Sequence, residues 1–248
     1  MKFATATVLL ALGAFTVAAP HEKRQMAEVI TSCTQPNTVA LTFDDGPWNY
    51  IRDISDTLTN NGAKGTFFFN GNNWGCIYDQ NHADGIRYVY GKGHQVASHT
   101  WRHANLAELT WDQVHDEMWR VEQALERIVG AVPAFMRPPY GSYNDNVRWA
   151  SAVRGQAIVN WDFDSGDSAG QSVAQQLSNY NNRISQRPNS ILALNHETYA
   201  STAYDVLPQV VQRLRQAGYR MVTVAECLGR QPYQRVVQPG TPDGNWRC

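Results

Sequence analysis

The sequence has little charge and no basic run, and both scarcities exclude classes of partner. Of its 248 residues, 17% are charged, and the formal net charge is −1. Binding to a nucleic acid or to an anionic membrane surface depends on clustered lysine and arginine, which this chain lacks. A neutral substrate therefore suits the sequence better than a nucleic acid or a membrane does.

Other absences limit the architecture. The chain has no internal repeat, no long linker rich in proline, glycine and serine, and, beyond its N-terminus, no apolar run long enough for a membrane helix. Its hydrophobic content of 43% is nevertheless enough to build a sizeable core. We expect one domain that acts as a monomer.

The N-terminus has the pattern of an export signal. Lys2 precedes an apolar stretch at residues 8–12, and small residues follow through Ala18 and Ala19. A buried N-terminal helix is the alternative, but the order of a positive end, an apolar middle and a small-residue exit favours a signal peptide at residues 1–19. We therefore expect a protein secreted to the extracellular space or the cell wall.

A dibasic pair follows the signal. Lys23 and Arg24 end a short pro-segment at residues 20–24, so we predict that the mature domain comprises residues 25–248. Within it we expect a folded core at about residues 37–226 and then a C-terminal tail.

Cysteine is scarce, and the four cysteines are too widely spaced for a zinc ribbon. An exported chain with an even number of cysteines is expected to form disulfides. Four cysteines allow three pairings, among which sequence alone does not choose. We favour Cys33 with Cys227, which flank the domain, and therefore Cys76 with Cys248, which would fasten the tail.

Short β-rich runs alternate with helical patterns along the chain, which predicts a parallel sheet. The clearest helix begins at Thr110 with capping-box spacing and ends at Gly130. Weaker apolar stripes end at Gly62 and Gly218. The predicted strands are residues 38–43, 66–70, 96–99, 134–137, 157–161, 191–196 and 221–224.

Polar side chains stand at the carboxyl ends of five predicted strands, where parallel barrels assemble their active sites. Composition alone does not separate an open sheet from a barrel, but this repeated placement favours an α/β barrel of about seven parallel strands. The residues are Asp44, Asp45, His99, Arg137, Asp162, Asp164 and His196.

Asp44 and Asp45 are adjacent acids at the point where an apolar strand stops. Neighbouring carboxylates repel each other, and the arrangement is most stable when a cation neutralises one and a hydrogen-bond donor holds the other. A turn with two solvated acids is the alternative. The histidines that follow favour the cation.

His99 and His103 are four residues apart, so one helical turn would place both imidazoles on the same side. With Asp45 they make a three-ligand site that leaves positions open for water and substrate. Two histidines and one carboxylate suit Zn²⁺, with Co²⁺, Ni²⁺ or iron as alternatives.

With Asp45 assigned to the metal, Asp44 is free to deprotonate an attacking water. An amide leaving group must then be protonated, and His196 is the candidate acid, although a structural strand-end histidine is the alternative. We expect Arg137, on a loop that two prolines stiffen, to orient Asp44. The backbone N–H of Tyr140 is expected to help bind the oxyanion.

Asp167 belongs to an acidic segment that follows the aromatic end of another strand. We expect its carboxylate to hold the imidazole of His196 and raise the pKa of that group. A solvated turn residue is the alternative.

Together these segments resemble the polysaccharide deacetylases of carbohydrate esterase family 4, the NodB homology family, and most of all their fungal chitin deacetylase branch. The resemblance spans about residues 37–226. Five motifs occur in family order, at residues 42–47, 99–103, 137–140, 161–167 and 194–196. The first two are highly specific when they occur together.

The resemblance implies a distorted, NodB-like (β/α) barrel and the same roles for the site residues. Asp44 is the implied base, His196 the acid and Arg137 the residue that orients the base; the implied metal ligands are Asp45, His99 and His103. Leu194 is implied to line a small pocket for the acetyl methyl group. The implied reaction is removal of N-acetyl groups from chitin or chitin oligosaccharides.

Two alternatives remain open at this stage. Acetylxylan or peptidoglycan would meet the same machinery, and a protein without catalysis would simply bind chitin oligomers. Sugar rings are expected to stack on aromatic side chains, Trp48 and Trp101 among them. Ser168 departs from the aromatic residue that many members carry after Asp167, which predicts a more open groove there and weakens the role given to Asp167.

Overall fold

The computed structural model describes Met1 and residues 25–248. Apart from Met1, the expected signal peptide and pro-segment therefore lie outside the described residues. None of the described helices is long and apolar enough to cross a membrane.

One curled parallel sheet of nine strands forms the centre of the described chain. Its order is β1, β7, β6, β4, β3, β2, β9 and β8, and β10 also pairs with β2. The two edge strands are not paired with each other within the described residues, so the barrel is open there. The strands are β1 (Val29–Ile30), β2 (Thr38–Asp44), β3 (Thr66–Phe69), β4 (Gln95–Ser98), β6 (Phe135–Met136), β7 (Ala157–Val159), β8 (Phe163–Asp164), β9 (Ser190–His196) and β10 (Arg220–Val222).

All seven predicted strands are confirmed, with small differences at their ends. The sheet also contains β1 and β8, two-residue strands that the sequence pattern did not indicate. A separate antiparallel pair joins β5 (Ala131–Pro133) to β11 (Tyr233–Val236).

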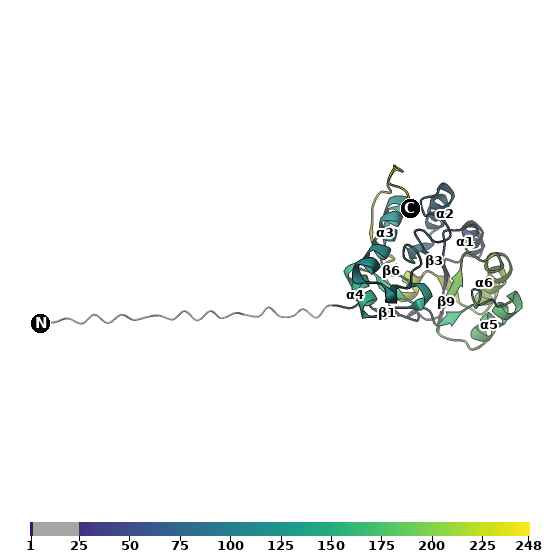
Figure 1. Cartoon of the computed structure of the whole chain (residues 1–248). Helices are drawn as coiled ribbons and strands as arrows, with labels where there is room; N and C mark the ends of the chain where they lie inside the picture. The colour runs from purple at the N-terminus through teal and green to yellow at the C-terminus, as the bar shows by residue number, and fades with distance from the viewer. Residues whose placement is uncertain (2–24) are drawn as a thin grey trace.

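Helices lie in an arc outside the sheet (Figure 1). The longest, α3, has the predicted capping box at Thr110 and ends at Gly130, whose left-handed φ of 74° favours glycine. The predicted stripes before Gly62 and Gly218 correspond to α1 and α6. The helices are α1 (Ile51–Asn60), α2 (Gln80–Gly91), α3 (Trp111–Val129), α4 (Asp145–Val153), α5 (Val173–Ser185), α6 (Leu207–Gln216) and α7 (Val224–Leu228).

Strand β2 occupies the middle of the sheet, and all seven of its residues are buried. Its apolar residues, at positions 39–41 and 43, point to both faces and fit a strand that is covered on both sides. It pairs with β9 along its whole length, from Thr38 opposite Ser190 to Asp44 opposite His196. This register places the first acid of one motif beside the histidine of another, although the two are far apart in the chain.

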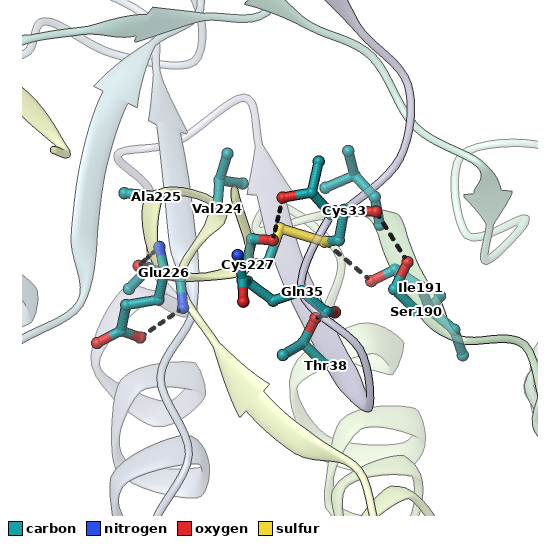
Figure 2. The surroundings of a disulfide bond; sticks show 12 residues. Cys33, Gln35, Thr38, Ser190, Ile191, Val224, Ala225, Glu226 and Cys227 are labelled. Carbon is teal, nitrogen blue, oxygen red and sulfur yellow. Dashed lines mark hydrogen bonds between the residues drawn. A yellow bond between two sulfur atoms is a disulfide. The ribbon is translucent and has the colours of Figure 1, made fainter. Parts of the chain in front are cut away.

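Two disulfides connect the ends of the domain, in the pairing favoured from the sequence. Figure 2 shows the bond between Cys33, just before β2, and Cys227 in α7. The carbonyl oxygen of Cys227 accepts a hydrogen bond from the backbone N–H of Gln35, which fixes the same junction. The second bond joins Cys76, in the loop after β3, to Cys248.

Candidate active site

A cavity of about 380 Å³ lies at the carboxyl ends of the central strands. Larger hollows exist elsewhere, but this one gathers the polar residues that the sequence singled out. Its lining is Asp44, Asp45, His99, His103, Pro138, Tyr140, Gly141, Trp161, Asp164, Ser168, Leu194 and His196. Chemistry rather than size therefore identifies it as the candidate active site.

One side of the cavity brings together Asp45, His99 and His103, whose candidate ligand atoms all lie within 4.8 Å of one another. Oδ1 of Asp45 is 3.5 Å from Nε2 of His99 and 3.2 Å from Nε2 of His103. Two ligands of a tetrahedral Zn²⁺, each about 2.0–2.1 Å from the ion, lie roughly 3.3 Å apart. The distances from Oδ1 of Asp45 to the two imidazole nitrogens are thus the ones that such an ion requires.

The protonation and hydrogen bonding of this cluster also fit a cation. Burial lowers the pKa of His99 to about 3, so its imidazole is neutral at physiological pH. Its Nδ1–H donates to the carbonyl oxygen of Arg137 at 2.7 Å, which leaves the lone pair of Nε2 facing Asp45. Oδ1 of Asp45 is buried and accepts no hydrogen bond from the described residues.

Backbone strain accompanies the cluster. Asp45, Thr100 and His103 have left-handed φ values of 72°, 70° and 56°, which residues other than glycine rarely adopt. Such conformations persist only where surrounding contacts hold them, and they concentrate at functional sites.

Asp44 lies beside this cluster, with one carboxylate oxygen held and the other facing the histidines. Its Oδ1 accepts a hydrogen bond from Nη1 of Arg137 at 2.9 Å, and its Oδ2 is 3.9 Å from Nε2 of His99. Burial raises the pKa of Asp44, although the positive charge of Arg137 acts in the opposite direction. Asp44 is therefore a stronger base than a solvated aspartate.

Arg137 is completely buried, and its donors are fixed from several sides. Besides Asp44, it donates to the hydroxyl oxygen of Thr42 at 2.6 Å and to the carbonyl oxygens of Val159 and Asn160 at 3.0 and 2.9 Å. The guanidinium carbon lies 4.4 Å from the ring centroid of Phe68. A cation held in this way keeps the Asp44 carboxylate in one orientation.

The opposite side of the cavity is built from His196 and Asp167. Nδ1 of His196 donates to Oδ1 of Asp167 at 2.8 Å, and the backbone N–H of His196 donates to Oδ2 at 2.7 Å. Burial alone would lower the pKa of His196, but its hydrogen bond to Asp167 and the nearby carboxylates raise it to about 9. The imidazole is therefore protonated at neutral pH.

The comparisons with known proteins agree with this geometry. The family model for polysaccharide deacetylase matches residues 31–159, more than half of the chain. The chitin deacetylase of Pestalotiopsis sp is 37% identical over 226 residues, which are 89% of this chain and 74% of that protein. The chain belongs to the polysaccharide deacetylase family.

The chitin deacetylase of Colletotrichum lindemuthianum is also a relative of this polysaccharide deacetylase. It is 35% identical over 242 residues, which cover 94% of this chain and 98% of that protein. Its solved structure has a TM-score of 0.80 at 34% identity, over 84% of this chain and 94% of that chain. The distorted (β/α) barrel expected from the sequence is thus confirmed, in a family whose members remove N-acetyl groups.

The residues expected to contact sugar have different environments in this deacetylase. Tyr140, at φ 61° and 70% exposed, lies edge-on to His103 with the ring centroids 4.8 Å apart. Leu194 lines the cavity, and Trp48 lies next to Trp74 outside it, 5.5 Å between ring centroids. Trp101 is only 2% exposed and packs in the core, so the expectation that it offers a stacking face is wrong.

Two residues of the deacetylase that the sequence did not single out lie close to the site, and the first of them supports the His196 side. Thr202 donates its hydroxyl to Oδ2 of Asp167 at 2.8 Å from a short π-helical turn, Thr202–Val206. Glu197 is completely buried, and its Oε1 accepts the backbone N–H of Trp48 at 2.7 Å. Burial raises the pKa of Glu197 well above its usual value. Only its position next to His196 could have drawn attention to Glu197.

Proposed function

We propose that this protein hydrolyses the N-acetyl groups of chitin or chitin oligosaccharides, releasing acetate and leaving free amines on the polymer. The observation that carries the proposal is the convergence of three groups on one cavity: the cluster of Asp45 with two histidines, the Arg137–Asp44 pair and the Asp167–His196 pair. The chitin deacetylase relatives, which match most of the chain, support the choice of substrate.

Asp45, His99 and His103 are proposed to hold a divalent metal, Zn²⁺ in preference to Co²⁺ or Ni²⁺. When bound, such an ion supplies a Lewis acid that polarises the acetyl carbonyl and acidifies water. The support is the unpartnered Oδ1 of Asp45, the neutral imidazole of His99 and the spacing of the three ligand atoms.

Two residues of the chain are assigned the two proton transfers, Asp44 as the base and His196 as the acid. Asp44 takes a proton from the water that attacks the acetyl carbon, and Arg137 holds that base in position. His196, protonated through its contact with Asp167, gives a proton to the nitrogen as the C–N bond breaks. Asp44 and His196 are register partners at the ends of the neighbouring strands β2 and β9, which supports the proposal that both act on the same substrate amide.

The residues that bind the substrate are assigned from their positions in and around the cavity. Leu194 is proposed to contact the acetyl methyl group, since its side chain lines the cavity between the two sides. The backbone N–H of Tyr140 is proposed to help bind the oxyanion, and the rings of Tyr140 and Trp48 to contact sugar. The protein is further proposed to be secreted and to act as a monomer; its two disulfides support export.

Acetate release with metal removal and replacement tests this proposal. We expect acetate from chitin oligomers, loss of activity after exhaustive chelation, and recovery on addition of Zn²⁺ or Co²⁺. Acetylxylan and peptidoglycan serve as parallel substrates, with mass spectrometry of the products. Full activity after complete metal removal would refute the metal, and acetate from acetylxylan alone would refute the choice of chitin.

A further inference from the structure

The loop that carries His99 and His103 is held by hydrogen bonds from the segment that follows β3. The side-chain amide of Asn70, after β3, donates to the carbonyl oxygens of His99 and Thr100 at 2.5 and 3.0 Å. The backbone N–H of Gly71 donates to the carbonyl of Thr100 at 3.2 Å. These bonds hold carbonyl groups of the loop, and at its start the backbone N–H of His99 donates to the carbonyl oxygen of Phe69 at 2.8 Å.

Helix α3 holds the next part of the loop, before His103, through Glu117. Its Oε2 accepts the backbone N–H of Arg102 at 2.8 Å, and its Oε1 accepts the side-chain Nε–H of the same residue at 2.9 Å. Both oxygens of this carboxylate are therefore bound to the residue that directly precedes His103.

The burial of Glu117 distinguishes this contact from an ordinary surface ion pair. The side chain of Glu117 is 1% exposed, whereas that of Arg102 is 62% exposed. Burying a carboxylate is costly unless hydrogen bonds compensate for its lost hydration. An exposed arginine could find water without any partner, so the feature that this geometry fixes is the backbone N–H of Arg102.

The neighbouring residue is restrained by the same helix. Trp101 is buried, and the guanidinium of Arg120, also in α3, lies 3.9 Å from the centroid of its ring. Residues 101 and 102 are therefore both tied to α3, while the residues on either side, Thr100 and His103, have left-handed backbones. A loop bent in this way relaxes unless both of its sides are held.

We propose that Glu117 is a positioning residue for the metal site. By fixing Arg102 between the two histidines, it sets the separation and orientation of His99 and His103 before any ion binds. This inference rests on the proposed function only in taking those histidines as ligands; its consequences concern binding of the ion and do not depend on catalysis.

Helix α3 contains a matched control in Glu122. This residue is also buried, at 4% exposed, and pairs with Arg154 and with the side-chain amide of Gln156. Its partners belong to the end of α4 and the segment just after it, and among the described residues its hydrogen bonds and ion pair do not reach the loop of His99 and His103. Glu122 variants therefore reproduce the loss of a buried carboxylate without touching the metal loop.

The experiment measures Zn²⁺ affinity of the metal-free protein by competition with a chromogenic chelator, together with its melting temperature. We expect Glu117→Ala to weaken Zn²⁺ binding about 10- to 100-fold, the range for partners that orient metal ligands. Glu117→Gln retains one oxygen for the N–H of Arg102, so a smaller loss is expected. Glu122→Gln should lower the melting temperature and leave Zn²⁺ affinity unchanged.

The outcomes distinguish a failure of the positioning role of Glu117 from a failure of the metal site itself. Equal Zn²⁺ affinities for Glu117→Gln and Glu122→Gln would overturn the positioning role, even if Glu117→Ala did not fold. Arg102→Ala, which keeps the backbone N–H, should retain most of the affinity; a loss as large as that of Glu117→Ala would overturn the emphasis on the backbone bond. Absence of Zn²⁺ binding by the unsubstituted protein would instead refute the metal site itself.

Discussion

The two sides of the active-site cavity differ in how many hydrogen bonds their buried carboxylates accept. On one side, Oδ1 of Asp45 is buried and accepts no hydrogen bond from the described residues. On the other, each oxygen of Asp167 accepts two hydrogen bonds, from His196, Ser168 and Thr202. Asp167 is therefore fully compensated by the protein, and Asp45 is not.

This difference indicates which of the two carboxylates requires a bound cation to compensate for its burial. A buried polar atom without a partner costs free energy, and a cation at the centre of the three ligand atoms removes that cost for Asp45. The Asp167–His196 pair needs no such addition, because the carboxylate and the imidazolium neutralise each other. In the proposed function, an ion completes one side of the site, and the fold preorganises the other.

The largest effect is expected where the two sides meet, at Asp44. Asp44→Asn removes the proposed base but keeps the shape of the side chain, so turnover should fall by about 10²- to 10⁴-fold. The ligand atoms of Asp45, His99 and His103 are untouched, so Zn²⁺ binding should persist. Steady-state acetate release and Zn²⁺ titration measure the two properties separately.

Asp45→Asn is the natural control, since it changes the adjacent carboxylate and should weaken Zn²⁺ binding as well as turnover. If Asp44→Asn turned over normally, Asp44 would not be the base. If it lost Zn²⁺ as completely as Asp45→Asn does, the two aspartates would share the ion and the proposed division between them would be wrong.

A smaller effect is expected from Asp167→Asn, which breaks only the preorganised side. The pKa of His196 is raised from 6.5 to about 9, so the proposed acid is protonated below that value and activity should decline as pH rises through about 9. Without the negative charge of Asp167, the pKa falls and the alkaline limb moves to lower pH. A return to the ordinary pKa of 6.5 would leave about a quarter of the acid protonated at pH 7.

The same change has a consequence for stability. A histidine whose pKa is raised by folding stabilises the native state fully below pH 6.5, and this contribution disappears as pH rises through about 9. Asp167→Asn should therefore flatten the dependence of melting temperature on pH in that window. If the alkaline limb of the pH profile of turnover were unchanged in Asp167→Asn, His196 would not be the acid.

Much of this comparison could be predicted from the sequence, because the motifs lie at the ends of strands with strong local patterns. Strand β2 has an apolar run at residues 39–41 followed by Phe43, and the capping box at Thr110 fixes the start of α3. Once the strands are parallel, their carboxyl ends share one edge of the sheet, which brings Asp44 near His196.

The parts that could not be predicted depend on tertiary contacts. Glu117 lies in a helix where a glutamate is ordinarily solvated, and nothing local indicates that Arg102 buries it. Trp101 follows a motif histidine, yet its exposure depends on Arg120 and on the close approach of Gly71. Strands β1 and β8 have two residues each, too few to show an alternating pattern.

The smallest effect on turnover is expected from the disulfides, which differ in their distance from the two sides. Cys76–Cys248 fastens the loop after β3, and the same loop supports Thr100 through Gly71. Cys33–Cys227 lies at the opposite ends of the strands, beside the start of β2. Replacing either pair by serine should lower the free energy of unfolding by about 2–4 kcal/mol, measured by denaturant titration.

Only the Cys76→Ser/Cys248→Ser variant should also weaken Zn²⁺ binding, because its loop supports the metal side. The Cys33→Ser/Cys227→Ser variant supplies the control, with a similar loss of stability and unchanged Zn²⁺ affinity. Among the described residues, the hydrogen bonds between Asp167 and His196 involve neither cysteine pair, so the alkaline limb of the pH profile should stay in place in both variants. Equal Zn²⁺ affinities in the two variants would show that the inner support of the metal loop does not depend on the C-terminal crosslink.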